Sequence, residues 1–283
     1  MSDLNCTLHA LFVHPVKSFA GIAVTQSLLL ETGLEFDRAW MLVDEGREMI
    51  TQRDQPRLAL VQPTLRHSDM VLRAPGMLAL HIALDRVEEP TRVRVWDDWV
   101  PAFDMGALAA QWCSDFLGRR VRLVRFDPQH RRLSDSRWTG AVQAPTAFAD
   151  GYALLVTSTA SLAELNRRLD LQGTPPVEMR RFRPNLVLDG IDAHDEDHID
   201  ILEIDTPQGL VQLKLVKPCA RCTVPGVDPD TGLQGFEVGD ALAGYRSDPR
   251  VDGAATFGMN AIVVRGVEHM LAVGQTGRAS FSF

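Results

Sequence analysis

The strongest constraint on the fold of this chain is a succession of short apolar runs, each bounded by Gly, Pro or another turn residue. In the first part of the chain these runs cover residues 8–13, 22–30, 40–43, 91–100 and 121–126. Short strands separated by frequent turns are typical of small β-barrels and sandwiches. We therefore expect a mostly β fold with a few helices (α+β) and a β-barrel-like N-terminal domain.

The clearest single element is a hairpin in the second part of the chain. Apolar and polar residues alternate along 210–216, and the turn Thr206-Pro207-Gln208-Gly209 joins this run to another apolar run at 199–204. Pro at the second turn position and Gly at the fourth suit a type I turn. Because further strands are predicted nearby, the second part is also expected to be mostly β, with strands over residues 152–157, 186–188, 261–264 and 269–273.

Two segments break the strand pattern with helical spacing. Trp112 and Phe116 lie one helical turn apart, and Gly118 then favours a helix end. In the second segment Ser158 and Ser161 are equally suitable N-cap residues. The predicted helices cover residues 106–118 and 158–169. A long polar segment begins after residue 126, so we place the domain boundary there and expect domains of residues 1–126 and 127–283.

Composition narrows the classes of function. The formal net charge is −8, whereas a nonspecific nucleic-acid binder normally carries a basic excess, so we expect no nucleic-acid partner. No apolar run approaches the ~20 residues that span a membrane, and the N-terminus lacks the pattern of a secretory signal. Four cysteines are too few for a disulfide scaffold, which favours a cytoplasmic setting without membrane attachment. Because no coiled-coil pattern is present, we expect a monomer.

The sequence KPCARC (217–222) at the end of the second hairpin strand is the first candidate site. Cys219 and Cys222 could form a redox dithiol beside Arg221, because a nearby cation favours the thiolate. They could also be half of a zinc site, or one of them could supply a thiolate to a soft transition metal. A pair of buried structural thiols is the remaining interpretation.

Two further segments are rich in charge. The sequence RRFR (180–183) places three arginines before a strand, where forked donors could hold a phosphate or carboxylate. The alternative is a solvated basic loop. Residues 192–200 combine several carboxylates with two histidines, but they lack the spacing of a calcium loop. We therefore expect this acidic segment to be a solvated loop.

Taken together, these motifs resemble a known family along essentially the whole chain. The first part resembles the N-terminal β-barrel domain that precedes the MOSC domain, which is named for the C-terminal domain of molybdenum cofactor sulfurase, in HPVKSF, DRAWMLVD and ITQRDQPRLALV. The second part resembles the MOSC domain itself in FADGYALLVTSTASLAELNRRL, RFRPNLVLDG, KPCARC followed by VDPDTG, FGMNA and VGQTG. Within this family the sequence is similar to the mitochondrial amidoxime-reducing component and its bacterial counterparts.

The resemblance implies an N-terminal β-barrel domain followed by a MOSC β-barrel domain. It also implies an oxidoreductase that binds the molybdenum cofactor (Mo-molybdopterin) and reduces small N-hydroxylated compounds such as amidoximes and hydroxylamines. Some bacterial members carry a fused ferredoxin-like domain, which this sequence lacks, so electrons are expected from a separate ferredoxin-like or cytochrome b5-like protein. The alternative is a protein that carries the cofactor or its sulfur without turnover.

Residue by residue, the resemblance makes Cys222 the metal ligand and the catalytic residue. Cys219 would then be structural or lie behind the ligand. The cofactor-binding positions that it implies, from both halves of the chain, are Lys17, Ser18, Arg38, Gly151, Tyr152, Arg183, Asn185, Ala220, Arg221 and Asn260. The chemistry is compatible, because a thiolate suits a soft metal and cationic side chains suit a phosphate. The chain departs from its relatives at Ile199, where Trp is common, and at Pro225-Gly226, beside the proposed ligand.

Overall fold

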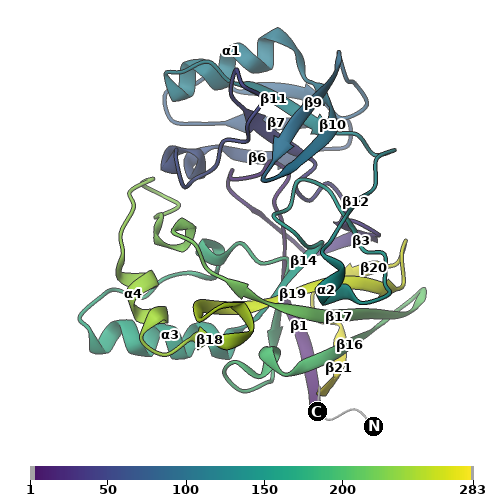
Figure 1. The fold of residues 1–283 in the computed structure, drawn as a ribbon, viewed down its shortest axis with the longest axis vertical. Coiled ribbons are helices and arrows are strands. Elements are labelled where there is room, and N and C mark those ends of the chain that lie inside the picture. The colour runs from purple at the N-terminus through teal and green to yellow at the C-terminus, as the bar shows by residue number, and fades with distance from the viewer. Residues whose placement is uncertain (1–3, 282–283) are drawn as a thin grey trace.

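The computed structural model describes residues 4–281, which form two lobes (Figure 1). The lower lobe contains a closed seven-stranded barrel, because the first strand of the order pairs with the last. One neighbouring pair, β14–β15, is parallel and the others are antiparallel. In order, the barrel strands are β14 (Leu154–Ser158), β15 (Leu186–Asp189), β1 (Leu4–Val13), β21 (Thr276–Phe281), β16 (Ile199–Thr206), β17 (Gly209–Ala220) and β19 (Ala254–Arg265).

Alternation along these strands fills the barrel with apolar side chains. In β17, Val211, Leu213 and Leu215 are buried in the barrel core, and the strand pairs with β16 as the sequence predicts, so the hairpin is confirmed. In β1 a bulge between Leu8 and Ala10 changes which positions face inward. A bulge adds one residue to one strand of a pair, and here it keeps apolar side chains inside along the whole strand.

The upper lobe packs two small sheets and one helix around a second core. Its four-stranded sheet contains β5 (Trp40–Val43), β11 (Arg122–Phe126), β10 (Asp98–Asp104) and β9 (Pro90–Val95). Its three-stranded sheet contains β6 (Gln62–Leu65), β7 (Asp69–Arg73) and β8 (Leu80–Ala83). The helix α1 (Gly106–Leu117) buries Trp112 and Phe116 against these strands and ends at Gly118, whose φ of +68° closes the helix as predicted.

Short strands complete the two lobes. β2 pairs with the end of β1, β3 pairs with both β4 and β20, β12 pairs with β13, and β18 pairs with β19. Their bounds are β2 (Ile22–Val24), β3 (Gln26–Leu30), β4 (Gly33–Leu34), β12 (Arg132–Leu133), β13 (Pro145–Thr146), β18 (Ser247–Asp248) and β20 (Met270–Ala272). The mostly β fold with a few helices is therefore confirmed.

The first strands of the chain belong to the lower lobe, although the elements from β5 to β11 build the upper one. β1 pairs with β15 and β21 of the barrel, and β2 pairs with β1. Leu29 of β3 and Leu34 of β4 lie in the barrel core, and only then does the chain enter the upper lobe (Figure 1). It returns through residues 127–153, which contain β12, α2 (Ser136–Thr139) and β13. As a result, the residues just after β1 and just before β14 both lie where the lobes meet.

Two helices flank the barrel on one side, α3 (Thr159–Leu171) and α4 (Glu237–Ala243). The structure decides between the two predicted caps, because the Ser158 side chain accepts a hydrogen bond from the backbone N–H of Ser161. Leu165 and Leu169 of α3 share an apolar cluster with stacked Phe182 and Phe257. In the described part of the chain, none of the helices has the length and apolarity that crossing a bilayer requires.

The acidic segment 192–200 is not the solvated loop that the sequence suggested. Glu196 is fully buried and accepts hydrogen bonds from the hydroxyls of Ser158 and Ser161, which lie at the start of α3. Asp197 is also buried and pairs with Arg246. Burial raises the pKa of Glu196 to about 7. The prediction was wrong because the partners of these carboxylates lie about 35–50 residues away in sequence, where a local charge pattern does not reveal them.

Candidate functional site

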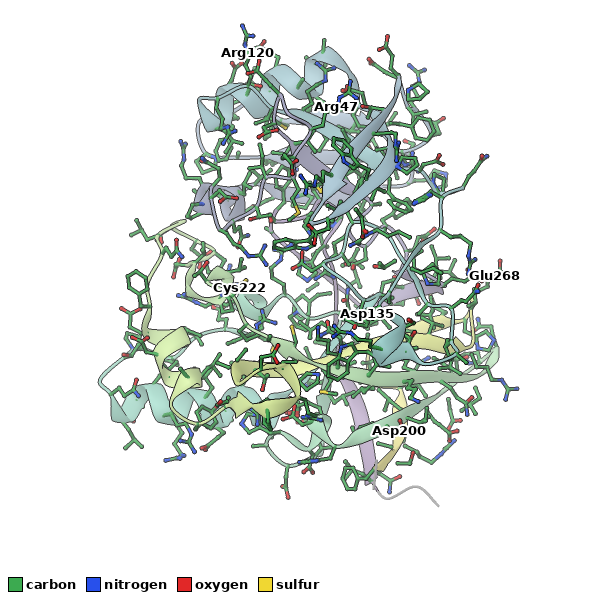
Figure 2. All side chains as sticks on the ribbon, viewed as in Figure 1. Arg47, Arg120, Asp135, Asp200, Cys222 and Glu268 are labelled. Atoms are coloured by element: carbon green, nitrogen blue, oxygen red, sulfur yellow. The ribbon has the colours of Figure 1, made fainter. Side chains whose placement is uncertain are left out.

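A cavity between the lobes brings together every site residue that the family resemblance implies. Cys222, which Figure 2 labels, lies on the part of the lower lobe nearest the upper lobe. The predicted residues come from six segments of the chain. Four are loops, which follow β1 or precede β5, β14 and β15, and the other two are the end of β17 with the residues after it, and β19. All eleven line the cavity: Lys17, Ser18, Arg38, Gly151, Tyr152, Arg183, Asn185, Ala220, Arg221, Cys222 and Asn260. Their assigned roles stay predictions.

Lys17 is a buried cation at one side of the cavity. Its Nζ donates hydrogen bonds to the backbone oxygen of Phe148 at 2.8 Å and to Asp150 Oδ1 at 2.5 Å. Burial lowers the pKa of Lys17, and the charge of Asp150 opposes that shift. Burial acts to raise the pKa of Asp150, but Lys17 and Arg53 outweigh it and hold that pKa well below its ordinary value. The pair therefore keeps both charges at the cavity wall.

Arg53 is a cavity residue that the sequence analysis did not single out. Its Nη2 lies 3.3 Å from Asp150 Oδ2, and its guanidinium also interacts with the Cys222 side chain. Burial opposes the charge of Arg53, but Asp150 and Cys222 both favour it and raise its pKa. Arg53 and Asp150 were missed because one Arg and one Asp in polar turns carry no periodic or motif signal.

Arg38 and Asn185 form a rigid frame on another side of the cavity. Arg38 donates to Asn185 Oδ1 and to the backbone oxygen of Arg183, both at 2.9 Å. Asn185 also accepts from the backbone N–H of Leu155 at 3.1 Å and donates to the backbone oxygen of Phe12 at 3.2 Å. These bonds satisfy the side chain of Asn185 and tie the start of β14 to the end of β1.

Two arginines of the cavity keep donors without a protein partner. Arg183 donates from Nη1 to the backbone oxygen of Phe19, but its buried Nη2 has no partner. Arg221 donates to Cys219 Sγ and to the backbone oxygen of Phe182, both at 3.0 Å, and its buried Nε has no partner. Burial and the charge of Arg38 lower the pKa of Arg183 to about 9. Buried donors are nearly always paired in proteins, so these atoms fit an anionic ligand that completes the site.

Backbone strain also gathers at this cavity. Ser18, Arg38 and Arg183 all adopt left-handed φ values, of +70°, +48° and +57°. Residues with a side chain rarely adopt this region, which costs about 1–3 kcal/mol each and persists where the surroundings fix it. All three side chains line the cavity, and strained residues of this kind are often found at binding sites.

The four cysteines fall into two groups. Cys6 and Cys113 are buried among apolar side chains, and burial raises their pKa values to about 11 and about 12. Cys222 is exposed, and Cys219 is partly buried and also lines the cavity. Within residues 4–281 no group of three or more His, Cys, Asp or Glu side chains could hold a metal ion. The arrangement fits one accessible thiolate ligand and gives no support to the zinc interpretation.

The three arginines at 180–183 point to different partners in the structure. Arg180 pairs with Asp230 and Arg181 pairs with Asp228, so their charges hold the loop that follows Cys222. Only Arg183 of the three lines the cavity with Cys222. The prediction that all three could cradle one anion was therefore wrong, because two of them find carboxylates about 50 residues further along the chain.

The loop after Cys222 also explains one departure from the family pattern. Gly226 is buried, and a Cβ atom there would lie 2.2 Å from the backbone oxygen of Gly235. Only glycine permits so close an approach of two backbone segments. The second departure, Ile199, packs into the barrel core. Pro225 and Gly226 thus belong to a tightly packed turn beside the cavity.

Comparison with known proteins matches both halves of the chain. The family described as the MOSC N-terminal beta barrel domain matches residues 5–120, and the family described as the MOSC domain matches residues 143–277. The predicted boundary after residue 126 lies between these ranges and stays a prediction.

Curated relatives match over most of the chain. Mitochondrial amidoxime-reducing component 1 of Mus musculus is 35% identical over 237 residues, which are 80% of this chain and 67% of that protein. Mitochondrial amidoxime reducing component 2 of Rattus norvegicus is 34% identical over 258 residues, which are 87% of this chain and 74% of that protein. Molybdenum cofactor sulfurase of Homo sapiens is 30% identical over 83% of this chain, but only 28% of that protein is covered.

Proposed function

Since this chain belongs to the MOSC family, with a MOSC N-terminal β-barrel domain before a MOSC domain, we propose that it is a molybdenum-cofactor-dependent reductase of N-hydroxylated compounds. One observation carries the proposal: an exposed cysteine lines a cavity in which two arginines keep buried donor atoms without a partner. A soft metal with a thiolate ligand and an anionic organic group needs both features. The similarity to amidoxime-reducing proteins over most of the chain supports the reaction class.

The residues present fit the cofactor. Cys222 would ligate the metal, while Arg183 and Arg221 would direct their free donors at the anionic group. Lys17 would add a positive charge that Asp150 keeps in place. The bound cofactor supplies a metal that exchanges two electrons, so that an N–OH group, two electrons and two protons yield an N–H group and water. The protein orients both reactants and keeps the cationic wall charged.

The electrons would come from a separate donor protein, either ferredoxin-like or cytochrome b5-like. The names of the relatives refer to amidoxime reduction and do not identify an electron donor. The cytoplasmic setting and the monomeric state are likewise expectations from the sequence.

The test is reduction of benzamidoxime by protein made in a host that synthesises the cofactor, with reduced methyl viologen as the electron source. The wild type should form benzamidine and water, and Cys222→Ser should fall to background. Cys219→Ser is the matched control and should keep most of the rate, because Cys219 is less exposed than Cys222 and a serine hydroxyl can still accept the hydrogen bond from Arg221. Equal loss in both variants would instead favour a Cys219–Cys222 dithiol and overturn the proposal.

The second candidate function is a carrier of the cofactor or its sulfur. It is favoured by the 30% identity to a molybdenum cofactor sulfurase and by the Pro225-Gly226 turn beside the ligand. A carrier would bind the cofactor through the same residues but would reduce neither amidoximes nor hydroxylamines with any reduced donor.

A further inference from the structure

Trp96 occupies a strained position at the tip of the β9–β10 hairpin. Its φ is +56°, a left-handed value that a bulky residue adopts only where its surroundings require it. Its side chain remains 44% exposed, so packing in a core does not explain why Trp stands there. A glycine or asparagine would fit this turn without strain. The side chain itself must therefore be useful at this position.

Trp96 contacts two residues that line the cavity. Its indole N–H donates to Asp150 Oδ1 at 3.3 Å, and the Arg53 guanidinium carbon lies 4.8 Å from the centre of its ring. Arg53 and Asp150 both line the cavity, and Arg53 also interacts with Cys222. One residue, Arg53, thus separates the indole from the proposed metal ligand.

These contacts fix the ring while leaving part of it open. The hydrogen bond from Nε1 sets the direction of the indole, and the guanidinium covers one side of it. Trp96 does not itself line the cavity, but its remaining surface is an exposed aromatic face beside two charged residues that do, Arg53 and Asp150. A planar, electron-poor ring is the partner that such a surface recognises best, because offset stacking combines burial with complementary ring electrostatics.

The same hairpin supplies a matched comparison. Trp99 is 47% exposed, but among the described hydrogen bonds and ring contacts none joins its side chain to a residue of the cavity. Its φ is not among the positive values that mark Trp96. Exposure alone therefore does not distinguish the two residues, whereas strain and connection to the cavity do.

We propose that Trp96 contacts the substrate and makes this protein prefer amidoximes whose amidoxime carbon is attached to an aromatic ring, as in benzamidoxime. The inference rests on the proposed function, because it concerns the substrate of the same site. The ring of the substrate stacks on the indole while its N–OH group enters the cavity towards Cys222. Trp96 takes no part in bond breaking, so its loss weakens binding and leaves the maximal rate nearly unchanged.

The experiment compares benzamidoxime with acetamidoxime, which carries a methyl group in place of the ring. In Trp96→Gly the KM for benzamidoxime should rise roughly two- to tenfold, the range expected for a lost aromatic pair. The KM for acetamidoxime and both kcat values should stay near those of the wild type. Trp96→Phe should restore most of the preference, and Trp99→Gly should change neither substrate.

Thermal unfolding separates this role from a merely structural one. Trp96→Gly relieves the left-handed strain, so its Tm should equal or exceed that of the wild type. A fall in Tm together with an equal rise in both KM values would overturn the inference, and so would unchanged KM values. If the wild type reduces neither compound, the proposed function fails. Quenching of tryptophan fluorescence by benzamidoxime, present in the wild type and absent in Trp96→Gly, then tests the stacking by itself.

Discussion

Two regions of the molecule bury charged side chains. One is the cavity between the lobes, and the other is the acidic segment 192–200, which contacts the start of α3. In the acidic segment both carboxylate oxygens of Glu196 accept hydrogen bonds, from the hydroxyls of Ser158 and Ser161. In the cavity Arg183 and Arg221 each keep a buried donor without a partner. Glu196 thus finds its partners within the protein, whereas Arg183 and Arg221 do not. Unpartnered atoms alone do not mark a binding site, because Asp197 Oδ1 and both ring nitrogens of His194 in the acidic segment also lack partners. Unpartnered cationic donors that line an open cavity are the better guide to function.

Replacing Arg183 should have the largest effect on cofactor binding, with no loss of stability. Arg183→Met removes a buried cation with an unpartnered donor, so the cofactor-free protein should keep its Tm or gain stability. Cofactor affinity should fall about 10- to 100-fold, which corresponds to the ~1.5–3 kcal/mol of a hydrogen bond to a charged group. Differential scanning fluorimetry of the cofactor-free protein and pterin content of the loaded protein measure the two effects. A lower Tm with normal pterin content would make Arg183 a structural residue.

Replacing Glu196 should give the opposite pattern. Burial raises the pKa of Glu196 from its ordinary value of 4.5 to about 7. Between these two pH values the folded protein holds a proton on Glu196 that the unfolded chain has released. Wild-type stability should therefore fall as the pH rises from about 4.5 to 7. Glu196→Gln should lose this slope and be more stable than the wild type at pH 8 by about 1–3 kcal/mol.

Urea unfolding at pH 5 and pH 8 checks this prediction. The molybdenum content of Glu196→Gln should match that of the wild type, because the cluster lies outside the cavity. A pH slope that persists in the variant would show that another group carries it.

A substitution in the turn after Cys222 should have the smallest effect, and that effect is on stability. Gly226→Ala would place a Cβ 2.2 Å from the backbone oxygen of Gly235, so the turn must shift and the protein should lose about 1–3 kcal/mol. Gly239→Ala, in α4, is the control, because no atom lies within 4 Å of its new Cβ. It should gain about 0.5–1 kcal/mol from helix propensity. Equal stabilities of the two variants would contradict the close packing of this turn.

The sequence predicted the parts of the molecule that local patterns determine. The hairpin around Thr206 and Gly209 follows from alternation and turn chemistry, and α1 follows from helical spacing before Gly118. The residues that line the cavity came from the family resemblance, since no spacing rule connects Lys17 with Arg183 or Cys222. Their meeting at one cavity is a result of the fold.

The remaining features depend on contacts between distant segments. The closure of the barrel needs β1 to pair with β15 and β21, which lie far along the chain. The burial of Glu196 and the pairing of Arg180 with Asp230 depend in the same way on partners that no local window contains. The sequence did not reveal Arg53 and Asp150 for the same reason, because they pair across 97 residues of sequence. Charge patterns in sequence report composition, whereas the partner decides whether a charge is solvated, structural or available to a ligand.

Molybdenum and pterin content is the measurement that tests the central claim most directly. Wild type, Cys222→Ser and Cys219→Ser would be purified from one host that makes the cofactor, then analysed for metals and for pterin fluorescence. We expect near-stoichiometric molybdenum in the wild type and in Cys219→Ser, with molybdenum lost from Cys222→Ser. Wild-type protein that carries neither molybdenum nor pterin, or a Cys222→Ser protein that keeps both, would contradict the account.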